Sequence, residues 1–152
     1  MIKPIKRHEA LHSLSHDHHQ GLLLSWKIRK GISMGVEIPR IKNYVNWFYL
    51  HHLAPHFELE EKHIFPVLGD THELIVKAVA DHAYIESLIS DAPDSYESLE
   101  TFAAALEAHI RFEERILFNE IQNKSTETQL KTIEQIHHET PFCENNEDVF
   151  WL

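Results

Sequence analysis

The strongest constraint on this fold is that two otherwise apolar helical stretches each carry a histidine and two adjacent acidic residues. The first stretch is "HFELEEKHIFP", residues 56–66, and the second is "HIRFEERILFN", which begins at His109. In both, the first acidic residue follows the histidine by four positions, and an Ile-Phe or Leu-Phe pair comes shortly after. Residues four apart lie on one face of an α-helix. The repeat therefore indicates that both stretches place charge at one shared site.

The rest of the chain favours helices over strands. Apolar residues recur at helical spacing, and only 4 of the 152 residues are glycine. With 43% hydrophobic residues, the chain fits one domain with a substantial core. We therefore expect a single all-α domain over residues 1–152, with a bundle core at about 15–122 and a C-terminal extension at 123–152.

Capping and turn signals predict four long helices and one short one. Gly69 suits a left-handed stop, and Pro55 predicts a kink inside the second helix. Asp70 with Glu73, and Asp94 with Glu97, resemble capping boxes. The expected helices run from after Ser15 to Gly31–Gly35, from Pro39 to Leu68, from Asp70 to Pro93, from Asp94 to about Gln122, and over residues 126–138.

Short connections between long helices favour antiparallel neighbours, so we expect an up-down-up-down four-helix bundle. The C-terminal segment "PFCENNEDVFWL" ends in three apolar residues. We expect this tail to dock on the bundle. Trp26, Trp47, Phe48, Phe57, Tyr84 and Phe112 are expected in the core.

The expected turns bring one histidine of each long helix to the same level. In an antiparallel hairpin, residues equidistant from the turn lie at the same height. His56 and His82 are centred on residue 69, His82 and His109 on residues 93–96, and His18 and His56 on residue 37. Each midpoint falls in an expected turn. Histidine is abundant here, with 14 copies, and it is a common ligand of transition metals.

The same geometry adds carboxylates to the histidines. Glutamates follow three of the four histidines by one helical turn. Each uncompensated carboxylate in a core would destabilise the fold by roughly several kcal/mol. Bound cations resolve this conflict. Imidazoles and carboxylates without a thiolate suit iron or manganese better than structural zinc. The expected ligands of two metal ions are His18, His56, Glu60, His82, Glu86, His109 and Glu113.

These motifs, with "DHAYIE" on the third helix, resemble the hemerythrin-like family of HHE cation-binding domains over roughly residues 15–122. The resemblance implies an antiparallel four-helix bundle with two iron ions bridged by two carboxylates and an oxo or hydroxo group. It also implies an open position for O2, peroxide or nitric oxide. Manganese or zinc are the alternative metals.

Three positions of the resemblance are ambiguous. Oxygen-carrying hemerythrins have two histidines four apart on the third helix, whereas here His82 is followed by Glu86. An anionic ligand would favour the ferric state, so we do not expect reversible O2 carriage. Glu114 competes with Glu113 for the fourth-helix position. On the first helix the candidates are His16, His18 and His19, with His18 preferred.

Two other functions were weighed against this one. A ferritin-like carboxylate oxidase would use a Glu-x-x-His signature, which fits at Glu60 and His63 but fails on the fourth helix at Arg115 and Ile116. A metal-free helical interaction module would leave the repeated motif unexplained. We interpret the chain as a protein that binds or senses O2, peroxide or nitric oxide or contributes to iron handling, with weak oxidase or peroxidase activity left open. His51, His52 and His63 are interpreted as peripheral, with His52 near an access path, and His8, His12, His72, His137 and His138 as solvent-facing or capping.

Charge and hydropathy exclude several other classes. The formal net charge is −10, which disfavours nucleic acid and anionic lipid as partners. The N-terminal residues lack the apolar block of a secretion signal, and the longest aliphatic run elsewhere is too short to span a bilayer. Cys143 is alone, which rules out a disulfide framework. We expect a cytoplasmic protein.

Overall fold

The computed structural model describes residues 7–136 and 142–152, and these residues fold into helices with no strand among them. This confirms the all-helical class. No helix in these two ranges is long and apolar enough to cross a membrane. The α-helices are α1 (His12–Ser33), α2 (Ile38–Phe48), α3 (Ala54–Leu59), α4 (Glu73–Ser90), α5 (Tyr96–Phe112), α6 (Phe118–Lys124) and α7 (Glu127–Ile136).

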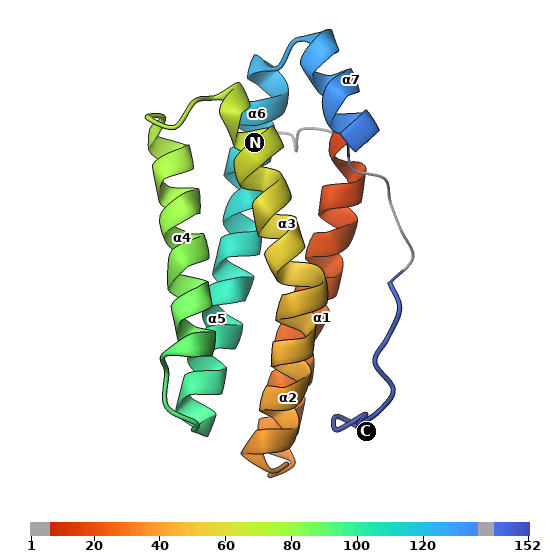
Figure 1. The fold of residues 1–152 in the computed structure, drawn as a ribbon, viewed down its shortest axis with the longest axis vertical. Coiled ribbons are helices and arrows are strands. Elements are labelled where there is room, and N and C mark those ends of the chain that lie inside the picture. The colour runs from red at the N-terminus through yellow and green to blue at the C-terminus, as the bar shows by residue number, and fades with distance from the viewer. Residues whose placement is uncertain (1–6, 137–141) are drawn as a thin grey trace, which may run out of the picture.

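Several of these helices are continuous with one another. α2 leads into α3 through a π-helical turn at Tyr49–Leu53, and α5 leads into α6 through another at Glu113–Leu117. We call α1, the continuous α2–α3 segment, α4 and the continuous α5–α6 segment the four rods. Figure 1 shows them lying along the long axis of the molecule, with α7 at one end. The α1–α2 and α4–α5 connections lie at one end of these rods, and the α3–α4 connection lies at the other. Both α1 and α4 pack along α5.

Two glycines make the turns that reverse the chain. Gly35 and Gly69 have φ values of 68° and 89°, in the left-handed region that favours glycine. Gly69 is therefore the stop that the sequence predicted, and Gly35 is the exit from α1. Gly31 lies inside α1 instead, where a Cβ atom would come within 2.7 Å of the Phe150 ring.

The expected capping boxes are wrong by one or two residues. His72 caps α4, because its imidazole accepts a hydrogen bond from the backbone N–H two residues on. Ser95 caps α5 by accepting from the N–H three residues on. Asp70 therefore precedes the helix start, and Asp94 pairs with Lys42. The start of the first helix after Ser15 is also too late, since a 3-10 turn at Glu9–Leu11 leads directly into α1.

The helix that contains Pro55 has a widened turn just before the proline, whereas the kink predicted there stays a prediction. Proline lacks an N–H, and its ring clashes with the carbonyl one turn before it. The backbone widens at Tyr49–Leu53, where the N–H of Ala54 reaches back to the carbonyl of Tyr49. Two further π-helical turns begin at acidic residues of the repeated motif, at Glu60–Ile64 and at Glu113–Leu117. Such turns are frequent at functional sites.

The buried apolar side chains form two clusters rather than one. One contains Leu24, Phe57 and Leu106, and the other contains Ile64, Phe65 and Phe118. The ring of His82 stacks on Phe57 at 3.8 Å between centroids and on Phe65 at 5.6 Å. A polar group therefore lies between the clusters and contacts both.

The aromatic residues are only partly where the sequence predicted. Phe48, Phe57 and Phe112 are buried. Trp26 and Tyr84 are wrong as core residues, because they are 53% and 52% exposed. Trp47 is partly buried against the first cluster.

The tail docks as expected over residues 142–152. Phe150 and Trp151 are buried, although Leu152 is exposed. The ammonium group of Lys27 donates to the Tyr44 hydroxyl at 2.9 Å and to Glu144 Oε2 at 2.6 Å. The tail is thus held by apolar burial and by an ion pair.

The contact between Gly31 and Phe150 predicts how a methyl group added at residue 31 changes the stability of the fold. Alanine in a helix interior normally stabilises by about 1 kcal/mol relative to glycine. Gly31→Ala should instead lower the free energy of unfolding by about 1–3 kcal/mol, because the methyl group overpacks a filled contact. Urea unfolding followed by circular dichroism measures this. In a Phe150→Ala background the same substitution should be neutral or stabilising, and destabilisation of equal size there would contradict the tail contact.

Candidate metal centre

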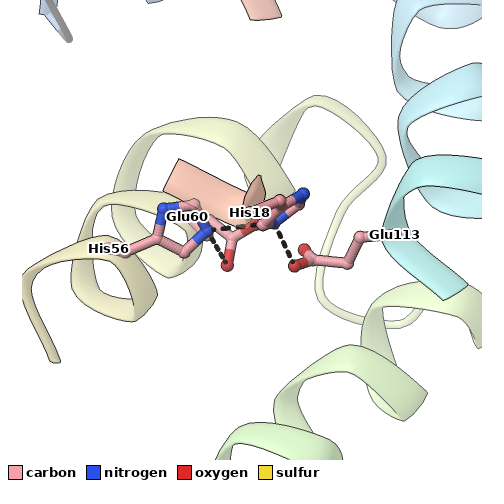
Figure 2. A group of neighbouring side chains, drawn as sticks. All are labelled: His18, His56, Glu60 and Glu113. Carbon is pink, nitrogen blue, oxygen red and sulfur yellow. Dashed lines mark hydrogen bonds and ion pairs between the residues drawn. The ribbon is translucent and has the colours of Figure 1, made fainter. Parts of the chain in front are cut away.

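Four side chains converge at the centre of the bundle in a first ligand set, which Figure 2 shows as sticks pointing toward one another. Their ligand atoms all lie within 4.8 Å of one another, and all four residues are buried. His18 Nε2 lies 3.1 Å from Glu113 Oε1, and His56 Nε2 lies 3.3 Å from Glu60 Oε1. We call His18, His56, Glu60 and Glu113 set A.

A second ligand set uses the same two glutamates. His82 Nε2 lies 3.3 Å from Glu60 Oε1, and His109 Nε2 lies 3.0 Å from Glu113 Oε1. Glu60, His82, His109 and Glu113, here called set B, also have ligand atoms within 4.8 Å of one another. Glu60 and Glu113 are 0% exposed. Each set therefore has two imidazoles of its own and two carboxylates that it shares with the other.

An outer layer of carboxylates orients all four imidazoles. Every histidine of the two sets directs Nε2 inward and Nδ1 toward a carboxylate oxygen. The four Nδ1 contacts are His18 to Glu114 at 2.7 Å, His56 to Asp17 at 3.0 Å, His82 to Glu61 at 2.8 Å and His109 to Asp81 at 3.1 Å. Such outer partners fix the ring orientation of metal-binding histidines.

The outer carboxylates follow a repeat that the sequence contains. The dipeptide Asp-His occurs at residues 17–18 and again at residues 81–82, and Glu-Glu occurs at residues 60–61 and 113–114. In each dipeptide one residue belongs to the ligand sets and its neighbour supports a histidine on another helix. The sequence reasoning missed this role of Asp17, Glu61, Asp81 and Glu114, although the doubled acidic residue and the Asp-His pair signalled it.

The outer layer fixes the protonation pattern at the centre. An ionised carboxylate only accepts hydrogen bonds, so each Nδ1 must donate. In a neutral ring Nε2 then carries a lone pair that points inward. His18 and His56 bring these atoms within 3.2 Å of each other, and His82 and His109 bring theirs within 3.1 Å. At most one proton fits between the two nitrogens of a pair.

The glutamates leave buried oxygens without hydrogen bonds. Both carboxylate oxygens of Glu60 and Oε2 of Glu113 lack a donor. Glu60 Oε1 lies 3.3 Å from two imidazole nitrogens, but neither contact has hydrogen-bond geometry. An unpaired buried carboxylate is costly. The donor set and its orphaned oxygens therefore fit metal cations.

The pKa values reflect the same convergence of acid and base. Burial alone would lower the pKa of His109, but Glu113 and Asp81 outweigh it and raise this pKa to about 10. His56 behaves in the same way, and Glu60 raises its pKa well above the usual value against the effect of burial. Burial alone would raise the pKa of Glu113, yet His109 holds it well below its usual range. The centre thus attracts positive charge.

The surrounding charges set how much positive charge the centre can take. Two central and four outer carboxylates surround the imidazoles. Arg7 pairs with Glu114 at 3.4 Å, and Lys77 pairs with Asp81 at 2.8 Å. With all six carboxylates ionised, two of these charges are offset by Arg7 and Lys77. Two divalent cations would neutralise the other four.

The structure brings six of the seven expected ligands together. His18, His56, Glu60, His82, His109 and Glu113 make up the two sets. On α1, His18 is buried whereas His19 is exposed and His16 belongs to neither set. Of the adjacent acids, Glu113 is central and Glu114 supports His18.

Glu86 is the expected ligand that the structure places elsewhere. It belongs to neither set, and burial, with a smaller contribution from its carboxylate, raises the pKa of the Tyr49 hydroxyl. The position four residues after a histidine therefore does not guarantee an inward direction here. The expectation that Glu86 favours the ferric state loses its basis.

The remaining histidines lie outside the two sets. His63 is exposed, so the Glu60-x-x-His63 signature of a ferritin-like centre does not form. His8 and His72 cap helices, as expected. His51 is exposed and His52 is half-buried. His137 and His138 lie outside the described residues.

A small cavity adjoins set A. Its volume is about 50 Å³, and His18, His56, His109 and Glu113 are among its lining residues. Gly21 and Ile110 also line it and pack closely, since a Cβ atom at Gly21 would lie 2.6 Å from Ile110 Cδ1. Phe57, which stacks on His82, is a further lining residue.

Helical rods with imidazoles and shared carboxylates at their centre define a helical cation-binding protein. The profile of the family described as hemerythrin HHE cation binding domain matches residues 9–121. The chain therefore belongs to this family, which confirms the resemblance found in the sequence. No curated protein and no solved structure gives a significant match.

The outer carboxylates predict that substituting a residue outside the two ligand sets lowers the affinity for metal. Glu61→Ala removes the acceptor of the His82 Nδ1–H and should weaken metal binding about 10- to 100-fold, because the imidazole loses its orientation. Competition against a chelator measures this. The matched control is Glu58→Ala, which removes an exposed acid of the same rod that pairs with Lys62. Equal affinities of the two variants would contradict the supporting role of Glu61.

Proposed function

We propose that this protein is a non-haem di-iron protein that binds or senses a small ligand such as O2, peroxide or nitric oxide. The observation that carries the proposal is that two histidine pairs share Glu60 and Glu113 at a buried centre. A shared carboxylate can bridge two metal ions. The function we propose thus needs two adjacent ions, one in each set.

The donor atoms favour iron over the other metals considered. Each set offers two imidazole nitrogens and two carboxylate oxygens and no thiolate. Soft ligands select copper(I), whereas this mixed set suits iron, with manganese or zinc as alternatives. Four donors leave coordination positions open on a six-coordinate ion. Iron, when bound, supplies redox chemistry and a place for a small ligand.

The cavity beside set A supports a small ligand as the partner. A water molecule needs about 10–15 Å³ of such space, so a cavity of about 50 Å³ admits a molecule of two or three heavy atoms. This size accords with O2, peroxide or nitric oxide.

The arrangement of the rods supports the finer assignment of the fold. We propose an antiparallel up-down-up-down four-helix bundle with the short helix α7 added. The connections between rods alternate between the two ends, as Figure 1 shows. In that topology each rod contributes to the centre at the same level. A cytoplasmic location, with no nucleic acid or membrane as partner, accords with the acidic composition.

The metal content and optical spectrum of purified protein test this function. Two irons per chain with oxo-to-iron charge-transfer bands are expected. One tightly held zinc would contradict the proposal. Stopped-flow mixing of the diferrous protein with O2 then separates a stable adduct from oxidation.

Removal of one histidine should lower the metal content. His109→Ala takes one of the two imidazoles from set B, and we expect the stoichiometry to fall from two irons to one or fewer. Elemental analysis after dialysis measures this. His63→Ala, which removes an exposed histidine, should keep two irons. Retention of two irons by His109→Ala would refute the assignment of set B.

Metal removal should destabilise the fold. A ligand at 100 times its dissociation constant stabilises by about 2.7 kcal/mol. One kcal/mol corresponds to about 2–4 °C for a domain of this size, so the metal-free protein should melt about 5–10 °C lower. Scanning calorimetry with and without chelator measures the difference. Equal melting temperatures would favour the metal-free interaction module.

A further inference from the structure

Two histidines of the cavity wall, His16 and His52, lie outside the two ligand sets. His52 lines the cavity beside His18 and His56. It lies one helical turn before His56 and is half-buried. Because it lines the cavity and belongs to neither ligand set, it faces a molecule in the cavity without being one of the grouped metal ligands.

Aromatic rings hold His52 from several sides. Its ring centroid lies 5.1 Å from that of Trp47, 5.3 Å from Phe48 and 4.8 Å from Phe142. Phe142 comes from the docked tail and also lines the cavity. These contacts orient the ring but use neither nitrogen. Within the described residues 7–136 and 142–152, neither ring nitrogen of His52 forms a hydrogen bond.

The backbone directs His52 toward the cavity. The widened turn Tyr49–Leu53, which precedes Pro55, contains both His51 and His52. Widened turns change the directions of successive side chains and are frequent at functional sites. Here His51 is exposed to solvent and does not line the cavity, whereas His52 does.

The protonation state of His52 suits a hydrogen bond to a small ligand. Burial lowers its pKa, and this effect exceeds the opposite influence of Asp17. The ring is therefore neutral at neutral pH. A neutral imidazole has one N–H donor and one acceptor nitrogen.

We propose that His52 donates a hydrogen bond to the small ligand that occupies this cavity, and that Phe142 of the tail positions its ring. This inference rests on the proposed function, because the ligand is the one that the metal centre binds. His52 would then favour small ligands that carry a hydrogen-bond acceptor. The tail contributes to ligand binding through Phe142.

Azide is a suitable probe, because it is a three-atom anion that fits the cavity and accepts hydrogen bonds. Iron-loaded wild-type protein, His52→Leu, His52→Gln and His51→Leu are titrated with azide, and the azide-to-iron charge-transfer band gives the dissociation constant. Iron content and melting temperature are measured for each variant. The infrared stretching frequency of bound azide reports the hydrogen bond itself.

Loss of the hydrogen bond should weaken azide binding about tenfold in His52→Leu, since a hydrogen bond to a charged group contributes about 1.5 kcal/mol or more. The azide frequency should shift as well. His52→Gln retains a donor and should stay within about threefold of the wild type, which is under 1 kcal/mol. His51→Leu should match the wild type. Phe142→Ala should weaken azide binding while His52 is intact.

Two results would overturn the inference. One is an unchanged dissociation constant and frequency in His52→Leu. The other is weaker azide binding in Gln20→Leu that equals or exceeds the weakening in His52→Leu, since Gln20 also lines the cavity. Failure of wild-type protein with two irons to bind azide would contradict this inference but not the metal centre. Failure to hold iron would contradict both.

Discussion

The structure depends on the convergence of four imidazole nitrogens and two carboxylates at one buried point. Glu60 and Glu113 are completely buried and keep oxygens without donors. Groups of this kind destabilise a core unless a cation is present. They also separate the apolar side chains into two clusters, which contain Leu24 and Ile64 respectively. The fold and the metal centre are therefore coupled, since balancing the charges between the rods stabilises their packing.

The two halves of the chain contribute to this centre in the same way but are not equivalent. The Asp-His and His-x-x-x-Glu-Glu patterns occur once in each half, and each outer carboxylate supports a histidine from another helix. The residue after His56 is Phe57, which stacks on His82, whereas the residue after His109 is Ile110, which lies against Gly21. Phe57 and Ile110 both line the cavity. The ligands of the two sets are thus nearly symmetric, whereas the side chains that surround them are not.

Much of the centre could be predicted from the sequence, because turn positions and helical spacing fix which residues share a level. The midpoints of the connections placed one histidine of each rod together, and the repeated motif added Glu60 and Glu113. The structure leaves Glu86 outside both sets, because helical spacing alone does not decide whether a side chain points inward. The widened turn before Pro55 could not be predicted, because a proline distorts a helix in several ways.

The central claim is that two cations occupy the space between the imidazoles. Anomalous diffraction at the iron edge from crystals of the iron-loaded protein tests it directly. We predict two peaks, one bound by His18 and His56 and the other by His82 and His109, with Glu60 and Glu113 in contact with both. A single peak, or peaks away from these four histidines, would contradict the account.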